Sequence, residues 1–348
     1  MLSRHPHFTR WAVILSAALL PVACDGGKDL TAPTPTVTGR VITAAAVTTN
    51  ADGRLKLRCT AQDHDNGLMG VDVFEFGDFA LYVPASVTAP RGLLLALGGP
   101  DTRGFVTGKP LGAPFPEVEA SLQVLGQELR TLASTCGLAI LGRRGAMKNE
   151  PASDQLLFDA VRTGAAMSGR PELPTAPVLV YGMSSGAPQA SGFTARNPER
   201  VAGLFLKVPL GVSSLSGAAL RVPTYMVQAE LDAFVNNAAT TAAFEGNRDA
   251  GALWARAMER GVIHHSLSAV QRQVTINWMS TILDLRLPAS PSDPLREIAE
   301  TSGWLGDRDT GEAKRWAAYR GDRAAASWLP SNHTAKEWEI FVSAAPIP

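Results

Sequence analysis

Charge is scarce and evenly balanced in this sequence. Only 18% of its 348 residues are charged, and 32 lysines and arginines stand against 32 aspartates and glutamates. A chain with this balance lacks the basic surface that attracts nucleic acid or an anionic membrane, so neither partner is expected on electrostatic grounds. Apolar residues make up 45% of the chain, which is typical of a globular protein and excludes a disordered or fibrous one.

Motifs for cofactors and metal ions are also lacking. Gly98-Gly99 is not followed by the Lys-Ser/Thr pair of a nucleotide phosphate loop. The acidic stretches Asp63–Gly67 and Asp307–Glu312 do not complete a calcium-binding loop, and acid-rich turns account for them more simply. We therefore predict no cofactor and no metal site.

The N-terminus has the pattern of an export signal. Arg4 and Arg10 precede an apolar stretch from Trp11 to Ala23. The 13 residues of this stretch are too few to cross a bilayer, which takes ~20 residues. Residues 1–23 are therefore predicted to be a signal peptide, and the protein is predicted to be exported.

The end of this segment, Leu20-Pro-Val-Ala-Cys24, resembles the lipobox of bacterial lipoproteins, in which the cysteine is lipidated and becomes the mature N-terminus. Pro21 departs from the aliphatic residue that is usual at its position. The resemblance implies a lipid on Cys24 as the only membrane attachment and a periplasmic or cell-surface location. A cleaved signal with an incidental cysteine, giving a secreted protein, is the alternative.

The chain contains only three cysteines. If Cys24 carries lipid, Cys59 and Cys136 remain as an even pair in an oxidising compartment. They are candidates for a disulfide, and two unrelated buried thiols are an equal alternative.

The chain divides into four segments by composition. After the signal peptide, residues 24–52 are rich in Thr, Ala, Gly and Pro and are predicted to be a flexible tether. Residues 53–288 are predicted to form the main domain, and residues 289–348 a small helical C-terminal extension. The four tryptophans of this extension are expected to pack its helices, with an aromatic platform for a polymer or sugar as the alternative.

Strand and helix patterns alternate along the main domain. Alternating apolar and polar residues from Val71 to Pro84 predict a hairpin. Continuous apolar runs then predict buried strands, and helical spacing predicts helices between several of them. The predicted strands span residues 92–97, 137–141, 176–181, 201–208, 222–229 and 252–259, and the predicted helices span residues 118–134, 155–167, 188–197 and 267–283. This order predicts an α/β fold with a mostly parallel, doubly wound sheet.

The most specific chemical motif follows the strand at residues 176–181. Gly182-Met-Ser-Ser-Gly186 matches G-x-S-x-G, in which a serine stands out from the sheet on a tight strand-to-helix turn. The flanking glycines remove side chains that would clash in such a turn. A buried strand precedes the motif and a helix with Pro188 in its first turn follows it. Ser184 is therefore the predicted nucleophile, and Ser185 is the rival candidate.

From Val178 to Leu206 the sequence resembles the α/β-hydrolase family. Gly182-Met-Ser-Ser-Gly-Ala and the later Arg196-Asn-Pro-Glu-Arg-Val-Ala-Gly-Leu look like the family's elbow, helix and following strand. A weaker resemblance extends over residues 76–287. The resemblance implies the α/β-hydrolase fold and a triad in the chain order Ser, Asp or Glu, His.

Two further segments resemble the parts of the family that supply the partners of the serine. The strand at residues 222–229 and the loop after it look like the family's acid loop, with Asp232 in the place of the acid and Glu230 as the alternative. The last predicted strand leads into a segment similar to the family's histidine loop. A Gly-x-x spacer there selects His264 as the base, and His265 remains open as the alternative.

An oxyanion hole needs two N–H donors aimed at the developing negative charge. By the resemblance, one is the backbone N–H of Ser185, and the other comes from the loop after the first buried strand. That loop is Leu97-Gly-Gly-Pro100, and because Pro100 has no N–H, Gly99 is the predicted donor. The loop departs from the family in lacking a His-Gly start.

These features predict a serine hydrolase that cleaves a carboxylic ester or a related acyl bond, in a small-molecule or polymer substrate, through an acyl-enzyme. A peptidase or an acyltransferase would use the same residues, and a non-catalytic binding or surface protein is the alternative from another class. The short sequence separation between Ser184 and Asp232 leaves little room for a large lid inserted before the acid. Residues 209–217 are expected to form a wall of the pocket.

Overall fold

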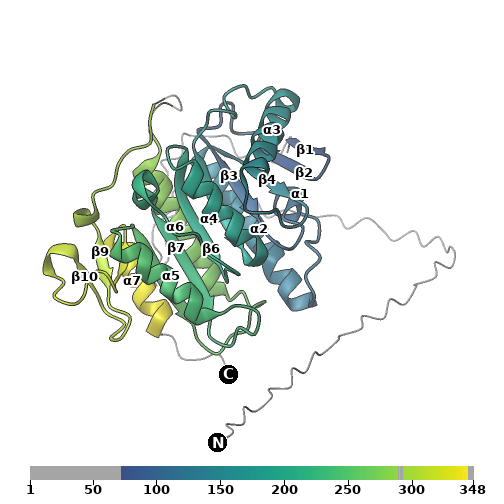
Figure 1. Ribbon diagram of the computed structural model, residues 1–348. Coiled ribbons are helices and arrows are strands. Elements are labelled where there is room, and N and C mark those ends of the chain that lie inside the picture. The colour runs from purple at the N-terminus through teal and green to yellow at the C-terminus, as the bar shows by residue number, and fades with distance from the viewer. Residues whose placement is uncertain (1–71, 289, 291–292, 344–348) are drawn as a thin grey trace, which may run out of the picture. The chain divides into compact units, whose positions relative to one another are not determined.

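The computed structural model describes residues 72–288, 290 and 293–343 (Figure 1). The predictions for the signal peptide (residues 1–23), Cys24, the tether (residues 24–52) and Cys59 concern residues outside this part of the chain. The described residues all belong to one compact unit.

An eight-stranded sheet forms the centre of this unit. Its strands are β1 (Asp72–Phe76), β2 (Phe79–Val83), β3 (Gly92–Leu97), β4 (Leu138–Arg143), β5 (Val178–Met183), β6 (Val201–Lys207), β7 (Thr224–Ala229) and β8 (Trp254–Glu259). The order across the sheet is β1-β2-β4-β3-β5-β6-β7-β8. The hairpin strands β1 and β2 are antiparallel, and β2 is antiparallel to β4. All other neighbouring strands of this sheet are parallel.

Helices cover both faces of the sheet (Figure 1). They are α1 (Arg103–Thr107), α2 (Pro116–Cys136), α3 (Pro151–Ser168), α4 (Ala187–Arg196), α5 (Asn237–Asp249) and α6 (Ala269–Arg286). Successive residues of a strand point to opposite faces. Leu93 and Leu95 of β3 therefore share an apolar core with α3 and α4, whereas Leu94 and Ala96 share the other core with α2 and α6. Burial on both faces explains why the parallel strands are apolar throughout.

This arrangement confirms the predicted fold class, a mostly parallel, doubly wound α/β sheet, and its strand order is that of the α/β-hydrolase fold. Helix α5 was not predicted, because its buried face holds Thr240, Asn247 and Arg248 beside one large apolar residue, Phe244. Such a face gives little apolar periodicity. Among the described residues, no helix is both long and apolar enough to cross a membrane.

The C-terminal extension contains more than the predicted helix. Helix α7 (Asn332–Ser343) is accompanied by a three-stranded antiparallel sheet of β10 (Ala313–Arg315), β9 (Trp304–Gly306) and β11 (Ser327–Leu329). Strands of three residues are too short to reveal themselves by alternation. Trp328 and Trp338 are buried, and their indole N–H groups donate to the carbonyls of Glu300 and Arg256. These two tryptophans therefore pack the extension, as expected.

Candidate active site

Ser184 stands on a sharp turn between β5 and α4. A single 3-10 turn, Ser184–Gly186, connects the two elements. The φ angle of Ser184 is +53°, which is a left-handed conformation that costs energy for a residue with a side chain. Among the described residues, Val208 is the other non-glycine residue with a positive φ, at +40°. Both residues border the same cavity, so the backbone strain is concentrated there.

The two glycines of the turn are required by close contacts. A Cβ on Gly182 would lie 2.5 Å from the Cβ of Ala190 in α4. A Cβ on Gly186 would lie 2.4 Å from the carbonyl carbon of Leu97, at the end of β3. Side chains at either position would therefore push α4 or β3 away from the turn.

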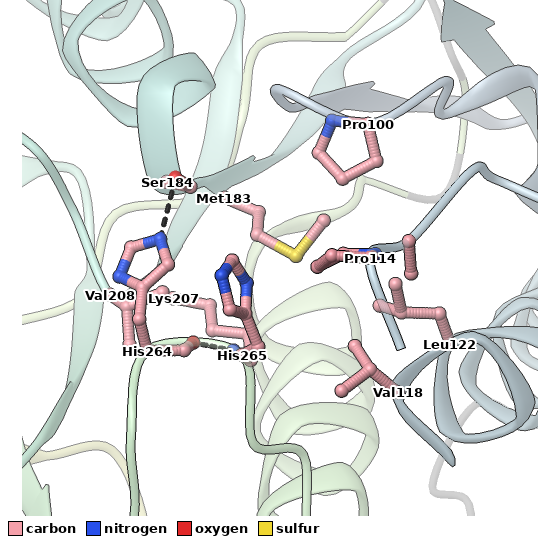
Figure 2. A pocket seen from close by; sticks show the side chains of 11 residues that line it. Pro100, Pro114, Val118, Leu122, Met183, Ser184, Lys207, Val208, His264 and His265 are labelled. Carbon is pink, nitrogen blue, oxygen red and sulfur yellow. Dashed lines mark hydrogen bonds between the residues drawn. The ribbon is translucent and has the colours of Figure 1, made fainter. Parts of the chain in front are cut away.

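Ser184, His264 and Asp232 form a continuous chain of hydrogen bonds. Ser184 Oγ lies 2.8 Å from His264 Nε2, a hydrogen bond drawn as a dashed line in Figure 2. His264 Nδ1 lies 2.7 Å from Asp232 Oδ2. Because an ionised carboxylate only accepts, His264 Nδ1–H donates to Asp232. Nε2 is then left to accept the hydroxyl proton of Ser184. The fold thus brings together the three side chains selected from the sequence.

Asp232 is held as a carboxylate inside the protein. Its side chain is fully buried, and its Oδ1 accepts hydrogen bonds from the backbone N–H groups of Phe234 and Val235 at 2.8 and 2.9 Å. Burial raises the pKa of Asp232, but the hydrogen bonds from His264 and from these two N–H groups outweigh it. The pKa of Asp232 therefore lies below its ordinary value, and the carboxylate is ionised at neutral pH.

The loops that carry Asp232 and His264 are tied together by three hydrogen bonds. The N–H of Glu230 donates to Glu259 O at 2.9 Å, and the N–H of Leu231 donates to Val262 O at 2.9 Å. The N–H of Gly261 donates to Glu230 Oε2 at 2.8 Å. Glu230, the alternative acid of the sequence analysis, therefore fixes the histidine loop and makes no hydrogen bond to His264.

His265 lies between two aromatic rings and makes no hydrogen bond to Ser184 or Asp232. Its ring centroid is 5.9 Å from that of Phe115 and 5.5 Å from that of Phe234. Burial and the nearby charges of His264 and Lys207 lower the pKa of His265, so its ring is neutral at pH 7. The geometry thus favours His264 over His265, a choice that the sequence left open.

The loop after β3 approaches the turn at Ser184 closely. A Cβ on Gly99 would lie 2.7 Å from Ser185 Oγ, so the two predicted oxyanion donors are neighbours. Thr102, which the sequence analysis did not select, holds this loop in place. Its side chain is buried, and its Oγ1 lies 2.8 Å from Ala96 O and accepts from the N–H of Arg143 at 2.9 Å.

A cavity of about 80 Å³ opens beside Ser184 (Figure 2). Its mostly apolar lining consists of Pro100, Ala113, Pro114, Val118, Leu122, Met183, Ser184, Lys207, Val208, His264 and His265. The expectation that residues 209–217 form a wall of this cavity is wrong. That segment instead packs against α4, where the N–H of Ser213 donates to Ser191 Oγ. One wall of the cavity, formed by Ala113, Pro114, Val118 and Leu122, comes from α2 and the residues before it.

Lys207, at the end of β6, is a buried cation in this cavity wall that the sequence analysis missed. Its Nζ donates to His264 O at 3.2 Å. Burial lowers the pKa of Lys207 to about 8, and the negative charges of Glu259 and Asp232 oppose this effect. A signal was present in the sequence, because the lysine ends an otherwise apolar strand and so had to be buried with it.

Cys136, the last residue of α2, is buried and disulfide-bonded. Both other cysteines of the chain, Cys24 and Cys59, lie outside the described residues. The pairing of Cys136 with Cys59 therefore stays a prediction.

No family model matches the sequence, and no curated protein matches it. Among solved structures, the chain is similar to esterase PE8, with 17% identity and a TM-score of 0.41 over 58% of this chain and 97% of that one. It is also similar to an S-formylglutathione hydrolase from Agrobacterium tumefaciens, with 16% identity and a TM-score of 0.40 over 62% and 95% of the two chains. At these values the likeness gives no information about activity.

Gly186→Ala is expected to destabilise the fold by about 3 kcal/mol, because the new methyl group would collide with the backbone of β3. Gly246→Ala is the matched control. A Cβ at Gly246, inside α5, meets nothing within 4 Å. Alanine there should therefore raise the free energy of unfolding by ~0.5–1 kcal/mol. Urea unfolding measures both. A Gly186→Ala variant as stable as the wild type would contradict the close approach of the turn to β3.

Lys207→Met is expected to change the pH dependence of stability. The pKa of Lys207 is about 8 in the folded protein and 10.5 when exposed. Between these values the unfolded chain binds the extra proton, so this group adds stability as the pH rises. From pH 7 to pH 9.5 the free energy of unfolding of the wild type should rise by about 2 kcal/mol relative to that of Lys207→Met. Urea titrations at the two pH values test this, and a constant difference would argue against a buried, charged lysine.

Proposed function

We propose that this protein is a serine hydrolase that cleaves a carboxylic ester through an acyl-enzyme on Ser184. The observation that carries the proposal is the unbroken chain of hydrogen bonds from Ser184 through His264 to the ionised Asp232, beside an apolar cavity. A serine hydroxyl alone is a weak nucleophile, and a histidine base oriented by a buried acid activates it.

In the first half of the reaction, Ser184 Oγ attacks the acyl carbon while His264 Nε2 takes the hydroxyl proton. The negative charge moves to the carbonyl oxygen, where the N–H groups of Gly99 and Ser185 are proposed to stabilise it. The carbon–oxygen bond to the alcohol then breaks, and His264 gives its proton to the departing oxygen. The acyl group remains as an ester on Ser184.

In the second half, a water molecule loses a proton to His264 and attacks the ester on Ser184. The carboxylic acid leaves, and the proton returns to Ser184 Oγ. Asp232 keeps the proton of His264 on Nδ1 throughout and stabilises the imidazolium that forms in each half. Its own charge persists because three donors hold it.

The cavity supports a short acyl group. Its volume of about 80 Å³ exceeds the ~10–15 Å³ that holds one water, but only several-fold. Its apolar wall favours an alkyl chain, and α2 closes its far side through Val118 and Leu122. We therefore propose esters of short carboxylic acids as substrates.

We also propose that the reaction takes place outside the cytoplasm, on a protein anchored by a lipid on Cys24. The support for export is the signal-like N-terminus. The disulfide bond of Cys136 agrees with it, because such bonds persist in oxidising compartments.

Labelling with a fluorescent fluorophosphonate tests the nucleophile. The wild type should be labelled, Ser185→Ala should keep the label, and Ser184→Ala should lose it together with at least ~10³-fold in ester turnover. Circular dichroism checks that Ser184→Ala stays folded. If the folded wild type took up no label, the chain would instead be a binding protein on a hydrolase scaffold.

The histidine doublet gives a second test. His264→Gln should lower kcat by ~10³-fold or more, because it removes the base. His265→Gln should keep most of the turnover, since His265 bonds to neither Ser184 nor Asp232. Initial rates on ethyl acetate, followed by titration of the released acid, compare the two variants. An equal loss in both would refute the assignment of His264 as the base.

A further inference from the structure

Exposed apolar side chains gather on the loops that carry the site. Ten large apolar side chains are exposed in the described part of the chain. Five of them border the site: Leu231, Phe234 and Ile263 lie on the loops of Asp232 and His264, Phe115 contacts His265, and the N–H of Leu210 donates to Ser184 O. Scattered single apolar residues need no explanation on a protein surface, but a concentration beside a reactive site indicates a binding function.

The most exposed of these five side chains touches the proposed base. Phe234 is 66% exposed, and its ring centroid lies 5.2 Å from that of His264. Leu231, 57% exposed, precedes it on the same loop. The N–H of Leu231 donates to Val262 O, so Leu231 lies beside the segment that carries Ile263. We call Leu231, Phe234 and Ile263 the apolar rim.

The chemistry of the reaction tells which part of an ester meets this rim. His264 must reach the oxygen of the departing alcohol in order to protonate it, so the alcohol lies next to the His264 ring. Phe234 packs on that ring, and none of the three rim residues lines the cavity that is proposed to hold the acyl group. The rim therefore flanks the alcohol and not the acid.

We propose that the apolar rim binds the alcohol part of the substrate, and that the natural substrates are short-acyl esters of long, apolar alcohols. This inference rests on the proposed function. The small cavity limits the acyl group, whereas the rim is open to solvent and sets no such limit on the alcohol. Each methylene that covers the rim loses part of its contact with water, and this favours binding.

The experiment is a series of acetate esters with ethanol, butanol and hexanol, below the concentration at which they aggregate. Full burial of a methylene corresponds to roughly fourfold in affinity, so half-burial on an open rim should raise kcat/KM about twofold per methylene. From ethyl to hexyl acetate the wild type should therefore gain on the order of tenfold.

The hexyl-to-ethyl ratio is the kcat/KM for hexyl acetate divided by that for ethyl acetate. Phe234→Ser and Leu231→Ser should each reduce this ratio to about a third of its wild-type value or less. The ratio is taken within each variant, so a general effect of Phe234→Ser on His264 cancels. Ile340→Ser is the matched control, because Ile340 is also 66% exposed but lies on α7 in the C-terminal extension. It should leave the ratio at the wild-type value.

Three results would overturn the proposal while leaving the hydrolase function intact. The first is a wild-type ratio near one. The second is an unchanged ratio in both rim variants. The third is an increase of kcat/KM with acyl length in a series of ethyl esters, if the rim variants abolish that increase. The rim would then bind the acid part of the substrate. Failure of the function itself would look different, since the wild type would release no acid from any ester and would take up no fluorophosphonate.

Discussion

The close approach between the turn after β5 and the end of β3 is the constraint on which the site depends. Gly186 leaves no space for a side chain against the backbone at Leu97, and Gly182 leaves none against α4. The chain turns within this space with Ser184 in a left-handed conformation. The same approach brings Gly99 next to Ser185, so one steric requirement sets both the nucleophile and its neighbouring N–H groups.

Charge around the site is balanced by protein groups, with little help from solvent. Asp232 has lost its water but accepts three hydrogen bonds, one of them from His264. Lys207 donates a hydrogen bond to the backbone carbonyl of the same histidine from inside the cavity wall. His264 is therefore held by hydrogen bonds between two buried groups of opposite charge.

Much of this arrangement could be predicted from the sequence, because its parts have strong local signals. Buried parallel strands are continuous apolar runs. The glycines two residues before and after Ser184 indicate a turn in which side chains would clash. Asp232 and His264 required the resemblance to a family, since a loop acid and a histidine doublet look alike in isolation. Lys207 and Thr102 act through contacts with residues distant in sequence, so no local pattern identifies their partners. The small sheet of the C-terminal extension has strands too short for any periodicity.

The position of that extension matters for the sheet as a whole. Strand β8 is the last in the order, so its outer side would otherwise present unpaired polar backbone groups. The hydroxyl of Ser327 lies 3.1 Å from the N–H of Arg256 and 3.0 Å from its carbonyl, and the Trp338 indole donates to that carbonyl as well. Side chains thus end the sheet where another molecule's strand could have joined it. Because these residues follow α6 in the chain, a chain cut short after α6 would retain every proposed catalytic group yet expose an edge that promotes self-association and aggregation.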